Sequence, residues 1–473
     1  MNHRQHTFSL RLAPALMLMT MLLCSSATVM AQGLTTGYFS DDLKTRHTMN
    51  PAIGNEQSYV AIPVIGNVNV KSMGNFGLED IMFDNPLYGI TSDRKKTTFM
   101  NPYLTGNVLS GLSETNRLRV QENISLASVG FKSFGGYNTV ELNVRTDAAM
   151  KLPYELFAFA ANQGNKHYNI GDINGEVQSF TELAFGHSRQ INEKWRVGGK
   201  VKLLFGIAEG TLDLNNVTAD LQSDNQWVMT LNGEANVSMK GFRYKSELRE
   251  YKRGGTYMRV NGADVDGAGL GGFGLGVDLG AVYKINEDWE VSASLLDLGF
   301  ISWSNQIVAR NDSKPFIFRG FRDIDLSDRH APEGFDTQTE RYSDQIADFA
   351  SLVDQGDQGG RTTGIGATFT AAGKYTLPAY RRLSFGVLST TRLGRFAWTE
   401  ARLNANISPL DWLDGALSFA YSTYSTSMGW MIHIHPKGYN FFFGMDHIMG
   451  KFSKEMIPLS SNASVSMGMS ITW

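Results

Sequence analysis

Hydrophobic and polar residues alternate without a break over the last ten residues of the chain, which read SVSMGMSITW at positions 464–473. Successive side chains of a β-strand point to opposite faces, so the apolar residues from Val465 to Trp473 share one face. Serine, glycine and threonine occupy the other face. A strand with one face suited to hydrocarbon and one suited to water, ending the chain on an aromatic residue, is typical of the last strand of an outer-membrane β-barrel.

Similar alternation recurs along most of the chain and predicts an all-β fold. We expect strands at about 57–71, 120–133, 137–147, 177–190, 195–212, 271–284, 289–310, 361–377, 381–393, 396–407, 412–424, 427–435, 438–448 and 462–473. This pattern predicts a transmembrane antiparallel β-barrel of about 14 strands, an even number, as single-chain bacterial barrels have. Segment 289–310 is long for one strand and contains Gly299, where we expect a kink or bulge in the wall.

Counting strands back from the C-terminus places the short turns on the periplasmic side and the long connections outside the cell. These extracellular loops are expected at about 72–119, 148–176, 213–270, 311–360 and 449–461. Short loop helices are expected at 153–161 and 343–353. Segment 241–259 is basic, which suits either contact with lipid phosphates or an ordinary solvated cluster, and 311–360 is acidic without the spacing of an EF-hand calcium loop.

Three of the short turns resemble one another and each is followed by tryptophan. They read INEKW at 191–195, INEDW at 285–289 and SPLDW at 408–412. The tryptophan ring is apolar and its N–H needs water, so the residue suits the membrane–water interface. We therefore predict that Trp195, Trp289, Trp412 and the terminal Trp473 are interfacial aromatics. The alternative is a set of ordinary hairpin turns in a soluble sheet.

The first 31 residues have the pattern of an export signal. Arg4 and Arg11 precede an apolar run at 12–24 that is too short to span a bilayer, and small residues around Ala31 offer a cleavage site. We predict that residues 1–31 are a cleaved signal peptide. An uncleaved anchor is one alternative; a lipoprotein at Cys24 is another, although Leu23 stands where a small residue is expected. Cleavage removes the only cysteine of the chain.

Composition narrows the class of protein further. The net charge is -3, so the protein as a whole lacks the positive electrostatic field that nucleic-acid binding uses. Beyond the signal there is no apolar run of about 18 residues, which excludes a helical membrane protein. In lipid, a sheet satisfies all its backbone hydrogen bonds only when it closes into a barrel. We therefore expect a protein of the cell outer membrane, with membrane lipid and lipopolysaccharide around it and the barrel-assembly machinery recognising its C-terminal strand.

No motif in the sequence predicts an enzyme, a cofactor or a metal site. The G-x-G-x-x-G letters at 269–274 run straight into a strand and lack the helix that a dinucleotide fingerprint needs. His433 and His435 share a strand face at metal-ligand spacing, but no third ligand is evident nearby, so we expect exposed rim histidines. His187 and Ser188 are adjacent and point to opposite faces, which prevents a nucleophile–base pair.

The N-terminal part carries a resemblance to a known family. Residues 32–56 show little periodicity but contain Asn50-Pro51-Ala52, and residues 57–473 form the predicted barrel. An N-terminal plug segment with Asn-Pro-Ala, followed by about 14 strands, resembles the long-chain fatty acid transporter (FadL) superfamily. The segment SLLDLGFISW at 294–303 is similar to one typical of uncharacterised Bacteroidota outer-membrane proteins. The transporter family usually has glycine after Asn-Pro-Ala, where this chain has Ile53.

The resemblance implies a porin-like channel for uptake of small hydrophobic molecules. Ligand would be caught near the outer mouth, the plug would shift, and the ligand would leave sideways through the wall beside a kinked strand. Asn50, Pro51 and Ala52 would anchor the plug, and Gly299 would mark the wall kink. The alternative is a non-transporting barrel that serves as a scaffold or shuttle partner for surface protein secretion, with loops 213–270 and 311–360 as the protein-binding surfaces.

Overall fold

The computed structural model describes residues 33–161, 166–222, 226–252, 254–267, 269–311, 313–319, 335–448 and 461–473. The predicted signal peptide and nearly all of the connection at 449–461 lie outside the described residues. The described chain begins with two short 3-10 helices, η1 (Thr35–Gly37) and η2 (Lys44–Thr48).

The prediction of an antiparallel barrel of about 14 strands is confirmed, because the wall is a closed 14-stranded antiparallel β-barrel. It closes where β24 pairs with β1 and β2, which in turn pair with β5. β1 and β2 together occupy the position of one strand in the wall, and so do β17 and β18. The wall strands are β1 (Tyr59–Ala61), β2 (Val68–Gly74), β5 (Thr115–Ser133), β6 (Gly136–Pro153), β7 (His167–Gln190), β8 (Trp195–Asp220), β12 (Gly272–Lys284), β13 (Trp289–Trp303), β17 (Arg361–Gly364), β18 (Thr368–Thr376), β19 (Leu383–Arg392), β20 (Trp398–Leu410), β21 (Leu413–Ser422), β22 (Thr426–Ile434), β23 (Tyr439–Met445) and β24 (Ala463–Thr472).

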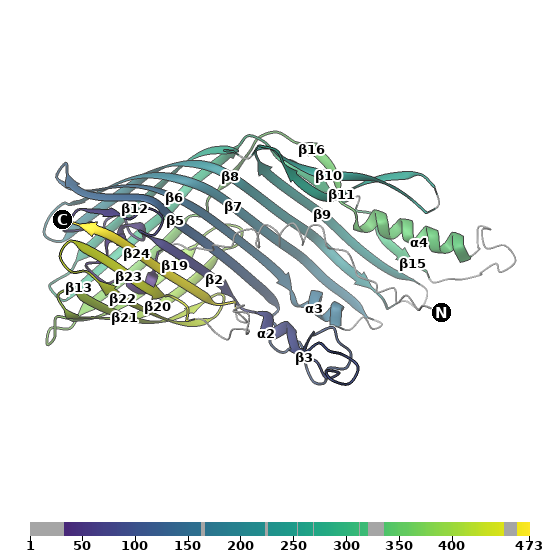
Figure 1. The fold of residues 1–473 in the computed structure, drawn as a ribbon, viewed down its shortest axis with the longest axis horizontal. Helices are drawn as coiled ribbons and strands as arrows, with labels where there is room; N and C mark the ends of the chain where they lie inside the picture. The colour runs from purple at the N-terminus through teal and green to yellow at the C-terminus, as the bar shows by residue number, and fades with distance from the viewer. Residues whose placement is uncertain are drawn as a thin grey trace.

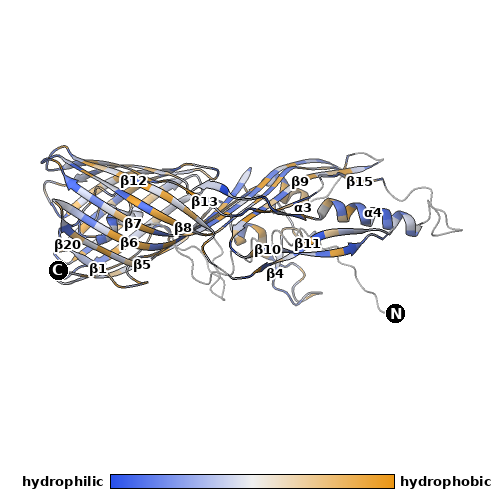
Figure 2. Cartoon of the chain, turned by 90° about the horizontal axis from the view of Figure 1, so that it is seen from above, coloured by the Kyte–Doolittle hydropathy of each residue, from blue (hydrophilic) through white to orange (hydrophobic). Residues whose placement is uncertain are grey.

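The wall strands bury their polar residues and expose their apolar residues, which is the reverse of the pattern in a soluble protein. Along β20, Arg402 is 1% exposed and Leu403 is 58% exposed. On β21, Ser418 is buried whereas Leu417 and Phe419 are exposed. Figure 2 shows hydrophilic and hydrophobic positions alternating along the wall strands. A barrel with a charged interior and an apolar exterior is stable where its outer surface contacts hydrocarbon. In water, the outward apolar side chains would stay exposed to solvent, which costs free energy.

The predicted extracellular loops contain much more β-structure than expected, and this part of the prediction was wrong. β6 continues through Pro153, β7 begins at His167, and β8 runs for 26 residues. At ~3.3 Å per residue, β8 is about 85 Å long, whereas an apolar band is about 25 Å tall. The long strands therefore continue past the barrel as a curved sheet (Figure 1).

This protruding sheet has its own apolar core. β9 (Trp227–Met239) pairs with β8, with β14 (Ile307–Arg310) and with β15 (Phe316–Phe318), and β14 pairs with β16 (Val353–Asp357). Tyr168, Leu212 and Leu231 belong to a buried cluster against which Phe159 and Phe349 pack. A separate hairpin, β10 (Phe242–Glu250) with β11 (Thr256–Val265), lies beside it.

The segment predicted as one strand at 289–310 is two strands. β13 belongs to the barrel wall, whereas β14 pairs only within the protruding sheet. The even number of wall strands is kept because β14 is not part of the barrel. The short elements of the predicted loop at 72–119 are α2 (Leu78–Ile81), β3 (Met82–Asp84) and β4 (Lys96–Thr98).

Both predicted loop helices are present, as α3 (Tyr154–Ala161) and α4 (Phe335–Ala350), although α4 begins and ends earlier than the pattern indicated. In the described part of the chain, no helix is both long and apolar enough to cross a membrane.

Candidate functional site in the barrel lumen

The N-terminal segment, residues 33–57, lies inside the barrel and touches its inner wall on several sides. Tyr38, Phe39 and Met49 share a buried cluster with side chains of β12, β18 and β19. Leu34 and Leu43 share another with side chains of β21, β22 and β23. Apolar side chains on an otherwise polar inner wall therefore form two sockets for this segment.

Asn50-Pro51-Ala52 lies against β12 and β13. The Asn50 side chain is fully buried, and its Oδ1 accepts a hydrogen bond from the Ala52 backbone N–H at 3.0 Å. Its Nδ2 donates to the Ala293 carbonyl of β13 at 3.3 Å and to the Tyr38 hydroxyl at 3.2 Å. A side chain at Gly198 on β8 would collide with the Pro51 backbone. The amide thus closes a local turn and ties it to the wall, which is the chemistry that an anchoring turn needs.

The start of the segment is held by charged residues that the sequence pattern did not single out. The backbone N–H groups of Thr35 and Thr36 donate to the Asp446 carboxylate at 3.0 and 2.7 Å. The Thr36 hydroxyl lies 2.8 Å from the hydroxyl of Ser418 on β21. Arg402 Nη1 donates to the same serine at 2.7 Å. These contacts satisfy the first N–H groups of η1 that a short helix leaves unpaired.

A chain of hydrogen bonds joins the segment to the opposite wall. Lys200 Nζ can only donate, so His47 Nδ1, at 3.1 Å, accepts from it. His47 Nε2 then carries the proton and donates to the Tyr59 hydroxyl at 2.7 Å, which lies 2.8 Å from the Ser128 hydroxyl. Burial lowers the pKa of His47 to about 4, so the ring is neutral at pH 7. Lys200 forms an ion pair with Glu141.

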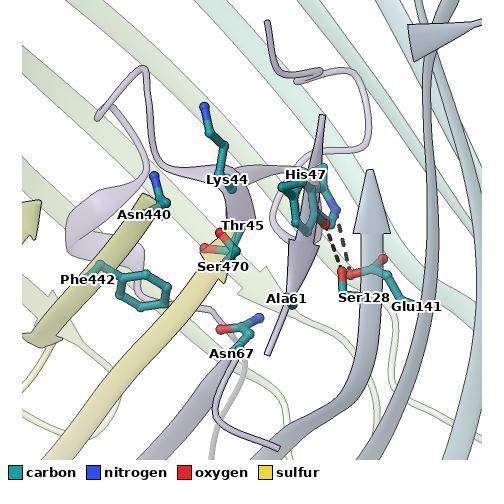
Figure 3. Close-up of a pocket in the computed structure, with 12 residues that line it drawn as sticks. Lys44, Thr45, His47, Ala61, Asn67, Ser128, Glu141, Asn440, Phe442 and Ser470 are labelled. Carbon is teal, nitrogen blue, oxygen red and sulfur yellow. Dashed lines mark hydrogen bonds and ion pairs between the residues drawn. The ribbon is translucent and has the colours of Figure 1, made fainter. Parts of the chain in front are cut away.

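These groups line a small pocket between the segment and the wall. Figure 3 shows His47, Ser128 and Glu141 on one side of the pocket and Asn440 and Phe442 on the other. The pocket has room for about one water molecule. At this level the N-terminal segment packs against the inner wall on both sides of the pocket.

The pairing of the wall strands is irregular near the predicted kink. β13 pairs with β18 up to Leu296 and with β17 from Phe300, and between these two ladders the Ile365 N–H donates to the Gly299 carbonyl at 3.2 Å. Asp297 has φ of +59°, and the pairing of β12 with β13 shifts register opposite it. Gly299 follows two residues later, where a side chain would collide with the backbone of β12. The distortion is therefore centred on Asp297.

A buried ion cluster lies on the lumen side of this irregular pairing. Arg145 donates to both oxygens of the Asp297 carboxylate, at 2.6 and 2.7 Å, and to Glu182 at 3.0 Å. Lys202 Nζ lies 2.7 Å from Asp297 and 2.8 Å from Asp278. Two cations and three carboxylates from five strands therefore meet behind the bulge and hold it in place.

The four predicted interfacial tryptophans lie at one end of the barrel. Trp195 and Trp289 begin β8 and β13, Trp412 precedes β21, and Trp473 follows β24. Their exposed fractions lie between 44% and 65%. Because neighbouring strands are antiparallel, the three strand starts and the one strand end share one rim. The rings of Trp195 and Tyr283 lie against each other, with centroids 4.7 Å apart and planes tilted by 43°.

Other sequence candidates have structural explanations. The G-x-G-x-x-G letters lie at the start of β12, where Gly274 packs against the β13 backbone. The basic segment at 241–259 is mostly the β10–β11 hairpin, whose Arg243 pairs with Asp266 at 2.6 Å. The expectation of exposed rim histidines was wrong, because His433 is fully buried beside Asp414.

Residues 51–446 match the model of a family described as "Family of unknown function (DUF5723)". The chain belongs to this family. The comparison with curated proteins finds no match.

Among solved structures, this family member is similar to FadL-type channels. These include the Ralstonia pickettii toluene transporter TbuX, with 9% identity, TM-score 0.39 and coverage of 94% of this chain and 95% of that chain. The Pseudomonas putida toluene transporter TodX has 7% identity and TM-score 0.38, covering 94% of each chain. A Pseudomonas aeruginosa FadL homologue has 8% identity and TM-score 0.35, also covering 94% of each.

Proposed function

We propose that the chain is an outer-membrane channel for small hydrophobic molecules and that the N-terminal segment is its gate. The observation that carries this proposal is that every wall strand pairs with its neighbours without a residue of 33–57. The segment is attached to the wall by side-chain hydrogen bonds and two apolar sockets. It can therefore leave its place while the barrel stays closed.

The membrane location is supported by the surface of the barrel. Its outward side chains are apolar over the wall strands, and tryptophans mark one rim. Single-chain barrels with this pattern lie in bacterial outer membranes. Membrane lipid and lipopolysaccharide would then contact the wall, and the assembly machinery would recognise β24.

The irregular pairing around 365–367 is the part of the wall where we expect a sideways exit. An apolar molecule gains free energy on entering the bilayer, so an opening in the wall would let it leave more readily than the water-filled end of the barrel. In the structure this part of the wall is closed, and the cluster of Arg145, Asp297 and Lys202 lies on its inner side together with Arg392, which donates to the Ile365 carbonyl at 3.0 Å. Opening therefore requires these side chains to shift as well as the N-terminal segment.

A disulfide between segment and wall tests the proposal. The Thr36 and Ser418 hydroxyl oxygens are 2.8 Å apart, and residues 32–473 contain no native cysteine to interfere. In cells carrying Thr36→Cys with Ser418→Cys, we expect oxidation to abolish uptake of an apolar dye that fluoresces in lipid, and reduction to restore it. Each single variant is the control. Equal uptake by the oxidised and reduced double variant, with the disulfide verified on a gel, would exclude this gate.

The protruding sheet favours a second candidate, a scaffold for surface protein secretion. Its strands continue well past the barrel and enclose two buried apolar clusters, which is more structure than a pore mouth needs. A scaffold would retain a stoichiometric protein partner on purification and would lose it when the 242–265 hairpin is deleted. Formation of the disulfide between positions 36 and 418 would not change the binding of that partner.

A further inference from the structure

Two histidines and one aspartate meet on the inner wall, near the rim that carries the tryptophans. His433 and His435 lie two residues apart on the strand β22 and the turn that follows it, and the residue paired with His433 on β21 is Asp414. Asp414 Oδ2 lies 2.9 Å from His433 Nδ1 and 3.2 Å from His435 Nε2. The three side chains are between 0% and 10% exposed.

The distances between these atoms are close to those around a common metal ion, and the stacked rings of His433 and His435, with centroids 4.4 Å apart, would rotate so that both nitrogens face it. A tetrahedral ion with bonds of about 2.0–2.1 Å holds its ligand atoms about 3.3 Å apart. The two measured separations are close to that value, and all three ligand atoms lie within 4.8 Å of one another. His435 Nε2 is buried and faces Asp414 Oδ2 at 3.2 Å. A metal ion held between this nitrogen, His433 and the carboxylate would be coordinated by all three.

Neighbouring groups orient two of the three ligands. His433 Nε2 lies 2.8 Å from the Asn440 side-chain amide, and the Ser40 hydroxyl donates to Asp414 Oδ2 at 2.9 Å. On metal binding, His433 Nδ1 would give up its proton to coordinate, Nε2 would be protonated, and the Asn440 amide would present its oxygen to it. Outer hydrogen bonds of this kind fix the ring orientation of metal-bound histidines.

We propose that Asp414, His433 and His435 bind a divalent metal ion of the zinc class beside the N-terminal segment. Imidazole and carboxylate ligands suit this class, and three protein ligands leave a position for water or for the Ser40 hydroxyl. The proposal does not rest on transport, since the three ligands lie on β21, on β22 and on the turn that follows β22.

Cobalt binding to the whole folded protein tests the site. Protein without a histidine tag, refolded in detergent and freed of metal, is titrated with Co²⁺. We expect one ion per chain, the visible absorption of four-coordinate Co²⁺, and its displacement by Zn²⁺. His435→Ala and Asp414→Asn should abolish the absorption, and Asn440→Ala should weaken binding by about 10–100-fold.

His187→Ala is the matched control, because His187 lies on β7 away from the cluster and bonds Asn138. Heat-dependent gel mobility verifies that each variant is a folded barrel. Absence of stoichiometric Co²⁺ binding, or binding that His435→Ala leaves unchanged in a folded barrel, would overturn the proposal.

Discussion

Deletion of residues 33–56 is expected to turn a closed barrel into a conducting pore. Eight-stranded barrels are filled by their own side chains, whereas 16-stranded porins leave an aqueous channel. A 14-stranded wall lies between these sizes, and here the N-terminal segment occupies the lumen. The exposed inner wall would carry charged groups such as Arg402, Asp446 and Lys200, which attract water and ions.

Planar-bilayer recording measures this effect. We expect the intact protein to stay near the baseline of a protein-free bilayer and the deletion variant to give long-lived conductance steps. Deletion of the 242–265 hairpin removes a segment of similar length from the protruding part and should leave the baseline unchanged. Identical conductance of the intact and 33–56-deleted proteins would show that the segment does not close the lumen.

Arg145→Met is expected to destabilise the folded barrel by about 3–5 kcal/mol, the cost of removing one partner from a buried ion pair. The substitution leaves Glu182, Asp278 and Asp297 facing the single cation Lys202. Adding Asp297→Asn should recover part of the loss, because it removes one of the uncompensated charges. Asparagine also tolerates the positive φ of this position, so the bulge is kept.

Urea unfolding, followed by the gel mobility of the folded barrel, measures the change in the free energy of unfolding. The matched control is Arg243→Met on the exposed β10–β11 hairpin, where loss of the ion pair should cost at most about 1 kcal/mol. If Arg145→Met shifts the midpoint no more than Arg243→Met, the cluster does not stabilise the wall.

The sequence is most informative about the barrel wall. Period-two alternation is a local property, so strand positions, the even strand number and the tryptophan rim can be predicted from it. The same property explains the error in the loops: alternation in residues 167–176 and 213–220 continues because those strands pack an apolar core beyond the barrel.

The lumen could be predicted only in part, because its contacts depend on strand register. Asp414 lies 19 residues before His433 and becomes its neighbour through the pairing of β21 with β22. Arg145 and Asp297 are 152 residues apart and meet across the inside of the barrel. The position of Asn50-Pro51-Ala52 could be expected from the family resemblance, but Thr36 and His47 lie in a segment without periodicity.

The central claim is that the wall is apolar toward lipid and polar toward a closed lumen, and spin labels along β20 test it most directly. Cysteine is placed singly at Ala401, Leu403, Ala405, Asn404 and Asn406, labelled with a nitroxide, and the protein is reconstituted in lipid. Collision with oxygen, which concentrates in lipid, is predicted to be high at Ala401, Leu403 and Ala405 and low at the two asparagines. Oxygen collision without this period of two, or ready access of a water-soluble nickel complex to the three outward positions, would contradict a lipid-immersed barrel.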